Sequence, residues 1–142
     1  MENELIDKFK DALKTNNMKF TPQRLSILQE VVESKEHREC DEIYMSLKEQ
    51  NQNVSRATVY RTMDFLVDND FARKIDIGDG KSRYETKINH PHHDHMICVD
   101  TGKIIEFVSP EIEQIQDEIA EQKGYKIIKH VHQLFVKKIS WK

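Results

Sequence analysis

The sequence predicts an α+β protein built from two small domains. Its 142 residues suffice for one or two compact domains. In the first half, apolar residues recur at helical spacing, whereas the second half consists mainly of short alternating segments separated by turns that contain glycine. No run of 18 or more apolar residues occurs, so we expect no transmembrane helix and no membrane partner.

The composition narrows the class of protein further. The first ten residues mix acids with bases and lack an apolar core, so we expect no signal peptide and a cytoplasmic location. Only two cysteines are present, Cys40 and Cys98, which is typical of a reducing compartment. A net charge of −3 argues against general polyanion binding, but it is compatible with a locally basic surface.

Four helices are expected in the first half. The first covers residues 4–15, and the second begins at Thr21-Pro22, a hydroxyl N-cap followed by a proline at the first helical position. A third helix follows His37. The fourth begins after Ser55, a good N-cap, and places apolar residues one and two turns apart on one face.

A β-hairpin is expected after these helices. Residues 71–77 and 81–86 have strand character and flank Gly78-Asp79-Gly80, a tight-turn sequence. Several helices followed by a hairpin are typical of a winged helix-turn-helix domain, which we assign to residues 1–87. Residues 88–91 are predicted to form a hinge, because Pro91 interrupts strand pairing.

The remaining residues, 92–142, predict a small α/β domain. Two strands flank Asp100-Thr101-Gly102, a helix starts at Ser109-Pro110 and ends at Gly124, and alternation predicts a long strand over 125–139. A three-stranded sheet with one helix is too small for a robust core of its own. We therefore expect this domain to mediate dimerisation.

The fourth helix has the features of a DNA-recognition helix. From Gln50 to Met63 no acidic residue occurs, and the exposed face pairs Arg56 with Tyr60 and Ala57 with Arg61. Arginine, hydroxyl and aromatic side chains without a carboxylate suit contacts to phosphates and base edges. A solvated face that happens to lack acids is the alternative. The DNA-binding candidates are Lys19, Arg24, Ser55, Arg56, Thr58, Tyr60 and Arg61.

A histidine cluster follows the hinge, in the segment HPHHDHMIC over residues 90–98. Strand alternation places His93 and His95 on one side and His92 and Asp94 on the other, so one segment can supply two metal sites. Imidazole and carboxylate donors suit Zn²⁺, Fe²⁺, Mn²⁺ or Co²⁺. A histidine-rich surface loop is the alternative, and we interpret His90 and His132 as bystanders.

Together these motifs resemble the ferric uptake regulator (Fur) family of bacterial metal-responsive repressors. The resemblance rests on TPQR (21–24), ATVYRT (57–62), RYE (83–85), HHDH (92–95) and IIEF (104–107), which follow one another in the family's order. It implies a winged-helix DNA-binding domain followed by an α/β dimerisation domain. It also matches Tyr60, Arg61 and Lys19 to positions that contact DNA in the family.

The resemblance implies two metal sites per chain. One lies at the domain junction and uses His37, Glu85, His95 and Glu106, with His93 as a fifth donor. The other lies within the dimerisation domain and uses His92, Asp94, Glu113 and His130. Many members also hold a structural zinc in two CxxC pairs, but here the first pair reads CVDT and no cysteine follows Cys98, so a Cys₄ site is excluded on ligand count. We expect Cys98 to be a buried strand residue.

The donor set favours one branch of the family. The peroxide-sensing branch tends to have aspartate where this chain has Glu85 and Glu106, and the zinc-sensing branch tends to use a cysteine, a role that stays open for Cys40. We therefore expect Fe(II) as the physiological metal and Mn(II) as the alternative. Zn(II) binds such donors more tightly than either ion, so an isolated sample is expected to carry Zn(II) or Mn(II).

The expected function is a metal-dependent repressor of iron uptake and homeostasis genes, which binds a near-palindromic double-stranded operator as a homodimer. Whether dimers form tetramers stays open, and no small organic ligand is expected. A manganese- or peroxide-responsive regulator of the same family is the alternative. A metalloenzyme is disfavoured because four protein ligands leave little open coordination, and a metal buffer would not require the acid-free helix face.

Overall fold

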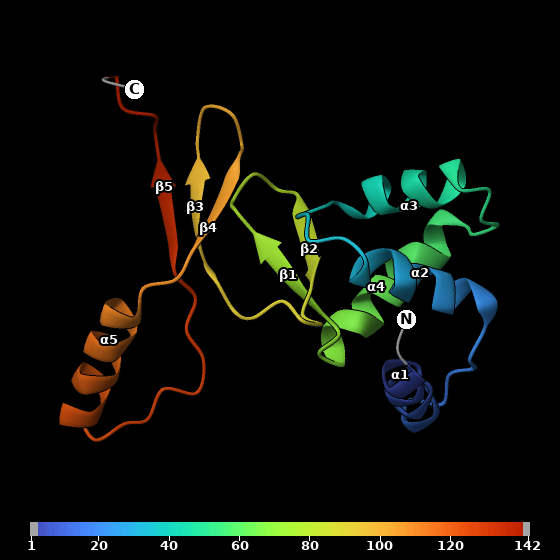
Figure 1. Cartoon of the computed structure of the whole chain (residues 1–142), viewed down its shortest axis with the longest axis horizontal. Coiled ribbons are helices and arrows are strands. Elements are labelled where there is room, and N and C mark those ends of the chain that lie inside the picture. Colours follow the sequence, from blue (N-terminus) through green and yellow to red (C-terminus); the bar gives the residue numbers. More distant parts are fainter. Residues whose placement is uncertain (1–2, 141–142) are drawn as a thin grey trace. The chain divides into compact units, whose positions relative to one another are not determined.

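The computed structural model describes residues 3–140 and divides into two compact units. The first unit ends at Pro91 and the second begins at His92, so residues 88–91 belong to the first unit (Figure 1). Within the described residues, no helix is long and apolar enough to cross a bilayer.

Four helices form most of the first unit: α1 (Asn3–Thr15), α2 (Pro22–Val32), α3 (Cys40–Glu49) and α4 (Arg56–Asp68). Local signals in the sequence set where they begin, since the Thr21 side chain accepts from the backbone N–H of Arg24 and the Ser55 side chain accepts from that of Thr58. Glu39 and Glu42 form a capping box at the start of α3. All four helices predicted from the sequence are present.

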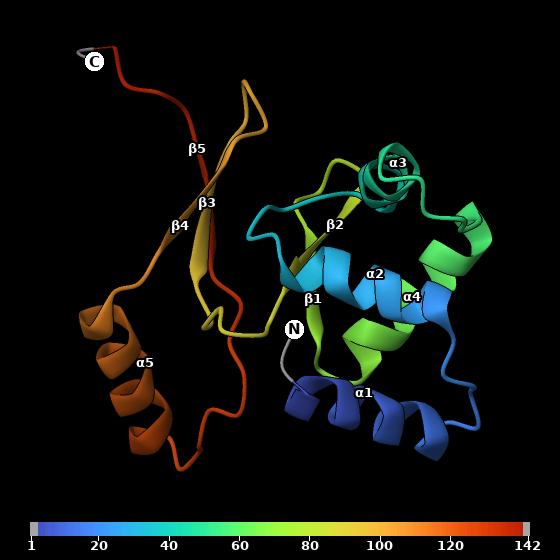
Figure 2. The ribbon, with the colours of Figure 1, turned by 45° about the vertical axis from the view of Figure 1, so that its right-hand side comes forward.

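Aromatic and aliphatic side chains from these helices build one core. Phe9 of α1 lies at its centre, with its ring edge-on to Phe65 and Phe71 at centroid distances of 6.0 and 5.8 Å. Leu28 of α2 and Met63 of α4 are fully buried beside it. Figure 2 shows the ribbons of α1, α2 and α4, the helices that supply most of these core side chains. The core fixes α4 and leaves its opposite face exposed.

The wing is the antiparallel hairpin of β1 (Ala72–Asp76) and β2 (Ser82–Thr86). Its turn contains Gly78 and Gly80, both with positive φ, as the turn sequence predicts. Four helices followed by this hairpin confirm the winged helix-turn-helix expected for the first half.

The second unit is a three-stranded sheet with one helix. Its elements are β3 (Asp94–Cys98), β4 (Ile104–Phe107), α5 (Pro110–Gln122) and β5 (Gln133–Val136). The strand order is β4-β3-β5, with β4 antiparallel and β5 parallel to β3. The sheet and the helix starting after Ser109 agree with the sequence-based expectation.

The long strand predicted over 125–139 is wrong. Only Gln133–Val136 pair with β3, and the preceding segment has no strand partner in the described structure. Ile128 is 96% exposed and Val131 is 71% exposed, so the alternation there reflects no buried face within one chain. Apolar alternation predicts a strand only where a neighbouring strand is long enough to pair with it.

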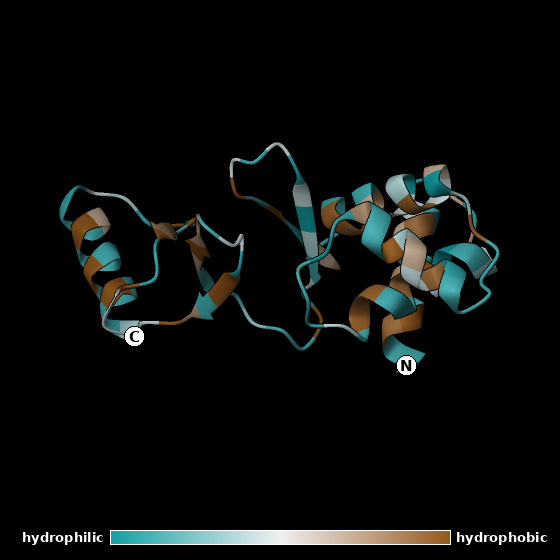
Figure 3. Ribbon diagram, turned by 90° about the horizontal axis from the view of Figure 1, so that it is seen from above, coloured by the Kyte–Doolittle hydropathy of each residue, from teal (hydrophilic) through white to brown (hydrophobic). Residues whose placement is uncertain are grey.

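Much of the second unit's apolar surface is exposed. None of the residues of α5 is buried, and Ile115 and Ile119 on this helix are 56% and 50% exposed. Brown apolar segments alternate with teal polar ones along α5 in Figure 3. An exposed apolar face of this kind is typical of a surface that contacts another protein.

Candidate metal sites and nucleic-acid interface

Glu85 lies in β2 with a charged or imidazole side chain on each side. In the hairpin register its partner on β1 is Arg73. On the other side, Arg38 forms an isolated bridge with Tyr84, with backbone hydrogen bonds of 3.0 and 2.7 Å in the two directions. This bridge sets His37 beside Glu85, because neighbours of antiparallel partners also face each other.

These contacts stabilise the ionised form of the Glu85 carboxylate. Its Oε2 lies 3.0 Å from His37 Nε2, and its Oε1 accepts from Arg73 Nε at 3.1 Å. Burial raises the pKa of Glu85, but the hydrogen bonds and charges of His37 and Arg73 outweigh it and lower the pKa to about 2. Glu85 is therefore an anionic donor at neutral pH, as a metal ligand must be.

A second carboxylate anchors the segment that carries His37. Glu30 of α2 accepts from Arg38 Nη1 at 2.6 Å and from the Ser46 hydroxyl at 2.9 Å. Burial raises the pKa of Glu30, but these hydrogen bonds and that from Gln50 lower it overall. Because Arg38 follows His37 directly, this network orients the histidine in the way that outer contacts orient metal ligands.

His90 is not a bystander, contrary to the sequence-based expectation. Its Nε2 lies 3.0 Å from Glu85 Oε2, and its carbonyl oxygen accepts from Arg73 Nη2 at 2.7 Å. Lys35 Nζ donates to the carbonyl of Asn89 at 3.1 Å. The segment before Pro91 is thus fastened to the first unit beside Glu85. No periodicity rule links His90 to Glu85, and only the turn after β2 brings them together.

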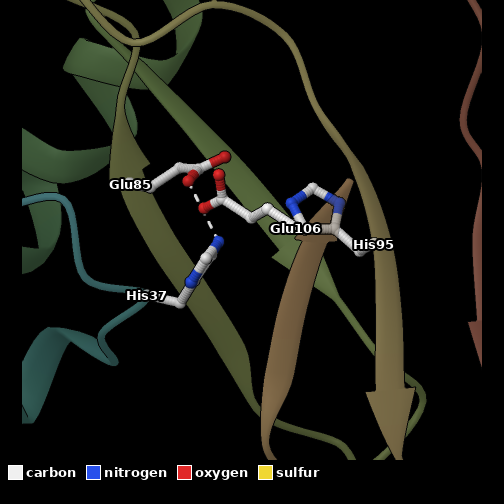
Figure 4. A group of neighbouring side chains, drawn as sticks. All are labelled: His37, Glu85, His95 and Glu106. Atoms are coloured by element: carbon white, nitrogen blue, oxygen red, sulfur yellow. Dashed lines mark ion pairs between the residues drawn. The ribbon is translucent and has the colours of Figure 1, made fainter. Parts of the chain in front are cut away.

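The second unit supplies its own pair of donors. His95 of β3 and Glu106 of β4 are register partners in the antiparallel ladder. His93 Nε2 lies 3.3 Å from Glu106 Oε2, so His93 and His95 both approach this carboxylate. Figure 4 shows the His37–Glu85 ion pair of the first unit as a dashed line, and it also draws His95 and Glu106.

A triangle of donors lies entirely within the second unit. His130 Nε2 is 2.9 Å from Asp94 Oδ1 and 3.2 Å from His92 Nε2, and His92 Nε2 is 3.4 Å from Asp94 Oδ1. Burial raises the pKa of Asp94, but the hydrogen bond and charge of His130 lower it overall. Glu113 Oε1 lies 4.0 Å from His130 Nε2, at the edge of the triangle.

The donor distances of this triangle fit a metal ion. Ligands about 2.0–2.1 Å from a tetrahedral Zn²⁺ are separated from one another by about 3.3 Å. The three separations given above lie close to this value, and each residue contributes one donor atom to the group. His92, Asp94 and His130 therefore fit one divalent ion, with Glu113 as the nearest further carboxylate.

Neither cysteine belongs to a group of candidate metal donors within residues 3–140. Cys40 is buried at the start of α3, and burial raises the pKa of its thiol to about 11, which makes it a poor donor. Cys98 is half-buried rather than buried as expected. Hydrogen bonds from Thr101 and from the backbone of this turn lower the pKa of Cys98.

The exposed face of α4 carries the residues that the sequence predicts for DNA contact. Arg56, Tyr60 and Arg61 are exposed, whereas Val59 and Met63 are fully buried. The predicted division of this helix into a buried stripe and an outer basic and aromatic face is therefore present. The first turn of α4 contains no acid.

A cavity of about 330 Å³ opens between the first turns of α2 and α4. Arg24, Ser55, Thr58 and Arg61, four of the seven DNA-binding candidates, line it. Residues of the N-terminal turns of both helices line this cavity, and the N-terminus of a helix suits a phosphate. Lys19 is exposed in the loop before α2, where its carbonyl accepts from the Arg24 guanidinium.

Comparison with known proteins places these features in one family. Residues 15–135 match the model of the ferric uptake regulator family. The ferric uptake regulation protein of Campylobacter jejuni is 41% identical over 133 residues, which cover 92% of this chain and 84% of that protein.

Solved structures agree with the sequence match. A Helicobacter pylori ferric uptake regulator, described as having three functional metal-binding sites, superposes with a TM-score of 0.86 at 32% identity, covering 95% of this chain and 89% of that one. The manganese-containing regulator of Pseudomonas aeruginosa gives a TM-score of 0.79 at 32% identity, over 91% and 96% of the two chains. The chain therefore belongs to the ferric uptake regulator family.

Proposed function

We propose that this protein is an iron-responsive repressor whose dimer binds operator DNA when a divalent ion joins its two units. Members of its family are metal-responsive transcription regulators rather than enzymes. The observation that carries the proposal is a pair of donors in each unit, His37 beside Glu85 and His95 opposite Glu106. The cytoplasm, where bacterial DNA lies, is the proposed place of action.

The proposed sensory site takes both pairs. His37 and Glu85 bind from the first unit, and His95 and Glu106 bind from the second, with His93 as a fifth donor. A divalent ion held by these residues would supply a cross-link across residues 88–91. A switch from 1:99 to 99:1 between open and closed forms requires the ion to favour the closed form by about 5.5 kcal/mol. Ligand bonds that exist only in the closed form are a sufficient source.

The second proposed site belongs to the dimerisation unit. His92, Asp94 and His130 supply three donors, and Glu113 supplies the fourth once its side chain moves toward His130. Asp94 lies in β3, His92 lies just before β3, Glu113 lies in α5, and His130 lies in the segment before β5. An ion there would therefore tie the helix to the sheet. With no Cys₄ zinc site in the chain, we assign a stabilising role to this site.

Iron is the proposed physiological metal because of the donor chemistry. Each proposed site combines imidazole with carboxylate, and the carboxylates favour Fe²⁺ or Mn²⁺ over softer ions. The relative from C. jejuni is named a ferric uptake regulation protein, which favours iron over manganese. Zn²⁺ binds such donors more tightly than either, so the metal content of an isolated sample does not identify the physiological ion.

The proposed DNA interface is the exposed face of α4 with the cavity beside it. Arg61, Thr58 and Arg24 around the cavity suit phosphate contacts, whereas Arg56 and Tyr60 lie on the adjacent stripe of the same helix. The exposed apolar face of α5 and β5 is proposed to pair two copies. Two recognition helices in a dimer must then be spaced for major grooves about 34 Å apart.

Fluorescence anisotropy of a labelled near-palindromic, A/T-rich duplex tests this function. The full chain is titrated at fixed salt with Mn²⁺, an air-stable substitute for Fe²⁺, and then with a chelator, against a scrambled duplex. Specific binding that the chelator abolishes is the expected result. Binding that ignores the chelator would contradict the proposed switch, and no specific binding in either state would contradict the DNA-binding function.

Two matched variants test whether Glu85 is a ligand of the proposed sensory site. Glu85→Gln removes a proposed ligand and is expected to abolish metal-dependent DNA binding while the sedimentation coefficient of the dimer stays unchanged. Glu36→Gln removes the same charge from an exposed position next to His37 and is expected to bind like the unmodified protein. A Glu85→Gln protein that still responds fully to metal would contradict the sensory site.

A further inference from the structure

One carboxylate outside α4 contacts two of its DNA-binding candidates. Asp41, in the first turn of α3, accepts from Arg56 Nη1, and the Tyr60 hydroxyl donates to the same Asp41 oxygen at 3.3 Å. The Arg56 guanidinium also lies over the ring of Tyr44, 4.6 Å from its centroid. All four residues belong to the first unit, so the contacts do not depend on the second.

The position of this contact argues against a purely structural role. The Arg56 and Asp41 side chains are 55% and 58% exposed, and exposed ion pairs contribute little to folding stability. Asp41 is not needed to cap α3 either, because Glu39 and Glu42 form the capping box at that end. The contact instead occupies side chains on the surface proposed to meet DNA.

We propose that Asp41 sets the specificity of DNA binding by holding Arg56 and Tyr60 away from phosphates of unrelated sequence. This inference rests on the proposed function of α4. Non-specific affinity comes from cationic side chains that replace the counterions of phosphates, and a guanidinium already paired with a carboxylate is withheld from that exchange. The Asp41 charge also repels the DNA backbone near the helix.

On the operator, the competition between Asp41 and DNA for Arg56 and Tyr60 has a different outcome. Base-edge contacts that only the correct sequence offers compensate for releasing Arg56 and Tyr60 from Asp41. Random DNA offers phosphates alone, so there the contact with Asp41 competes more successfully. Asp41 thus lowers affinity for random DNA more than affinity for the operator, and the ratio of the two affinities increases.

The test compares Asp41→Asn with the unmodified chain, both loaded with Mn²⁺. Two labelled duplexes are titrated over a range of salt: one that the unmodified protein selects from a random pool, and a scrambled version of it. We expect Asp41→Asn to bind the scrambled duplex about fivefold more tightly. We also expect its slope of log K against log salt to steepen by about 0.9, as for one added phosphate contact. Affinity for the selected duplex should change less.

Two controls distinguish the effect of losing the Asp41–Arg56 contact from the effect of changing the net charge. Asp11→Asn removes an exposed acid from α1 and should leave the specificity ratio unchanged. In an Arg56→Gln background, Asp41→Asn should no longer steepen the salt slope. Thermal unfolding of each variant checks that the fold is retained.

Results that contradict the role of Asp41 in specificity can be told apart from results that contradict DNA binding itself. If Asp41→Asn has the same specificity ratio and salt slope as the unmodified chain, Asp41 has no role in discrimination. If it weakens binding to both duplexes, Asp41 positions Arg56 for DNA rather than withholding it. If the unmodified chain selects no duplex at all, the DNA-binding function itself is contradicted.

Discussion

Protonation of Glu85 should dominate the acid sensitivity of the metal-free protein. The pKa of this carboxyl is about 2 in the folded chain, against an ordinary value of 4.5. Since its pKa is depressed by folding, its contribution to stability is complete above pH 4.5 and is lost as the pH falls toward 2. The difference corresponds to about 3 kcal/mol of unfolding free energy.

The perturbation that isolates this contribution is Glu85→Gln. The amide keeps the shape of the side chain and an acceptor for Arg73, but it has no charge to lose. Urea unfolding is followed by circular dichroism in the presence of a chelator, from pH 5.5 to pH 2.5. The unmodified chain should lose about 2 to 3 kcal/mol more than Glu85→Gln over this range, because the loss is not yet complete at pH 2.5.

The control for this experiment is Glu36→Gln, which removes an exposed acid from the same loop as His37. It should follow the unmodified chain at every pH. Parallel pH profiles for the unmodified chain and Glu85→Gln would refute the reasoning, because they would show that His37 and Arg73 do not stabilise the ionised carboxylate.

Three further predictions follow from the sites. Iodoacetamide should label Cys98 well before Cys40, since the pKa of Cys98 is lowered and that of buried Cys40 is raised to about 11. Peptide mass spectrometry of the native protein measures the labelling, and equal labelling of the two cysteines would contradict this prediction. His130→Ala should reduce bound metal from two ions to one per chain by elemental analysis, and an unchanged content would exclude the triangular site. Tyr60→Phe combined with Arg61→Ala should abolish operator binding and leave metal content unaltered; retained binding would move the interface away from α4.

The sequence predicted those parts of the fold that depend on local signals. The helix starts after Thr21 and Ser55 follow from hydroxyl caps, which act within three residues of the cap. The hairpin turn is also a local signal, because Gly78 and Gly80 adopt the positive φ that the turn requires. The strand over 125–139 was wrong because pairing depends on β3, whose length is set elsewhere in the chain.

The candidate site was only partly predictable for a similar reason. The alternation predicted for β3 agrees with the groups of neighbouring donors, in which Asp94 lies with His92 and His130, apart from His93 and His95. The contacts of Arg73 and His90 with Glu85 depend on the register of β1 and on the turn after β2, so no spacing in the sequence reveals them. Residues brought together by strand register are visible only once the register is known.

A double-mutant cycle tests most directly whether one ion is shared by the two units. Metal affinity is measured by competition with a fluorescent chelator for Glu85→Gln, for His95→Ala and for both together, all in a His130→Ala background that leaves only the proposed sensory site. If one ion takes ligands from both units, either change alone should remove most of the affinity, and the double variant should lose little more. Losses that add within about 0.5 kcal/mol would show that Glu85 and His95 act independently and would contradict the shared site.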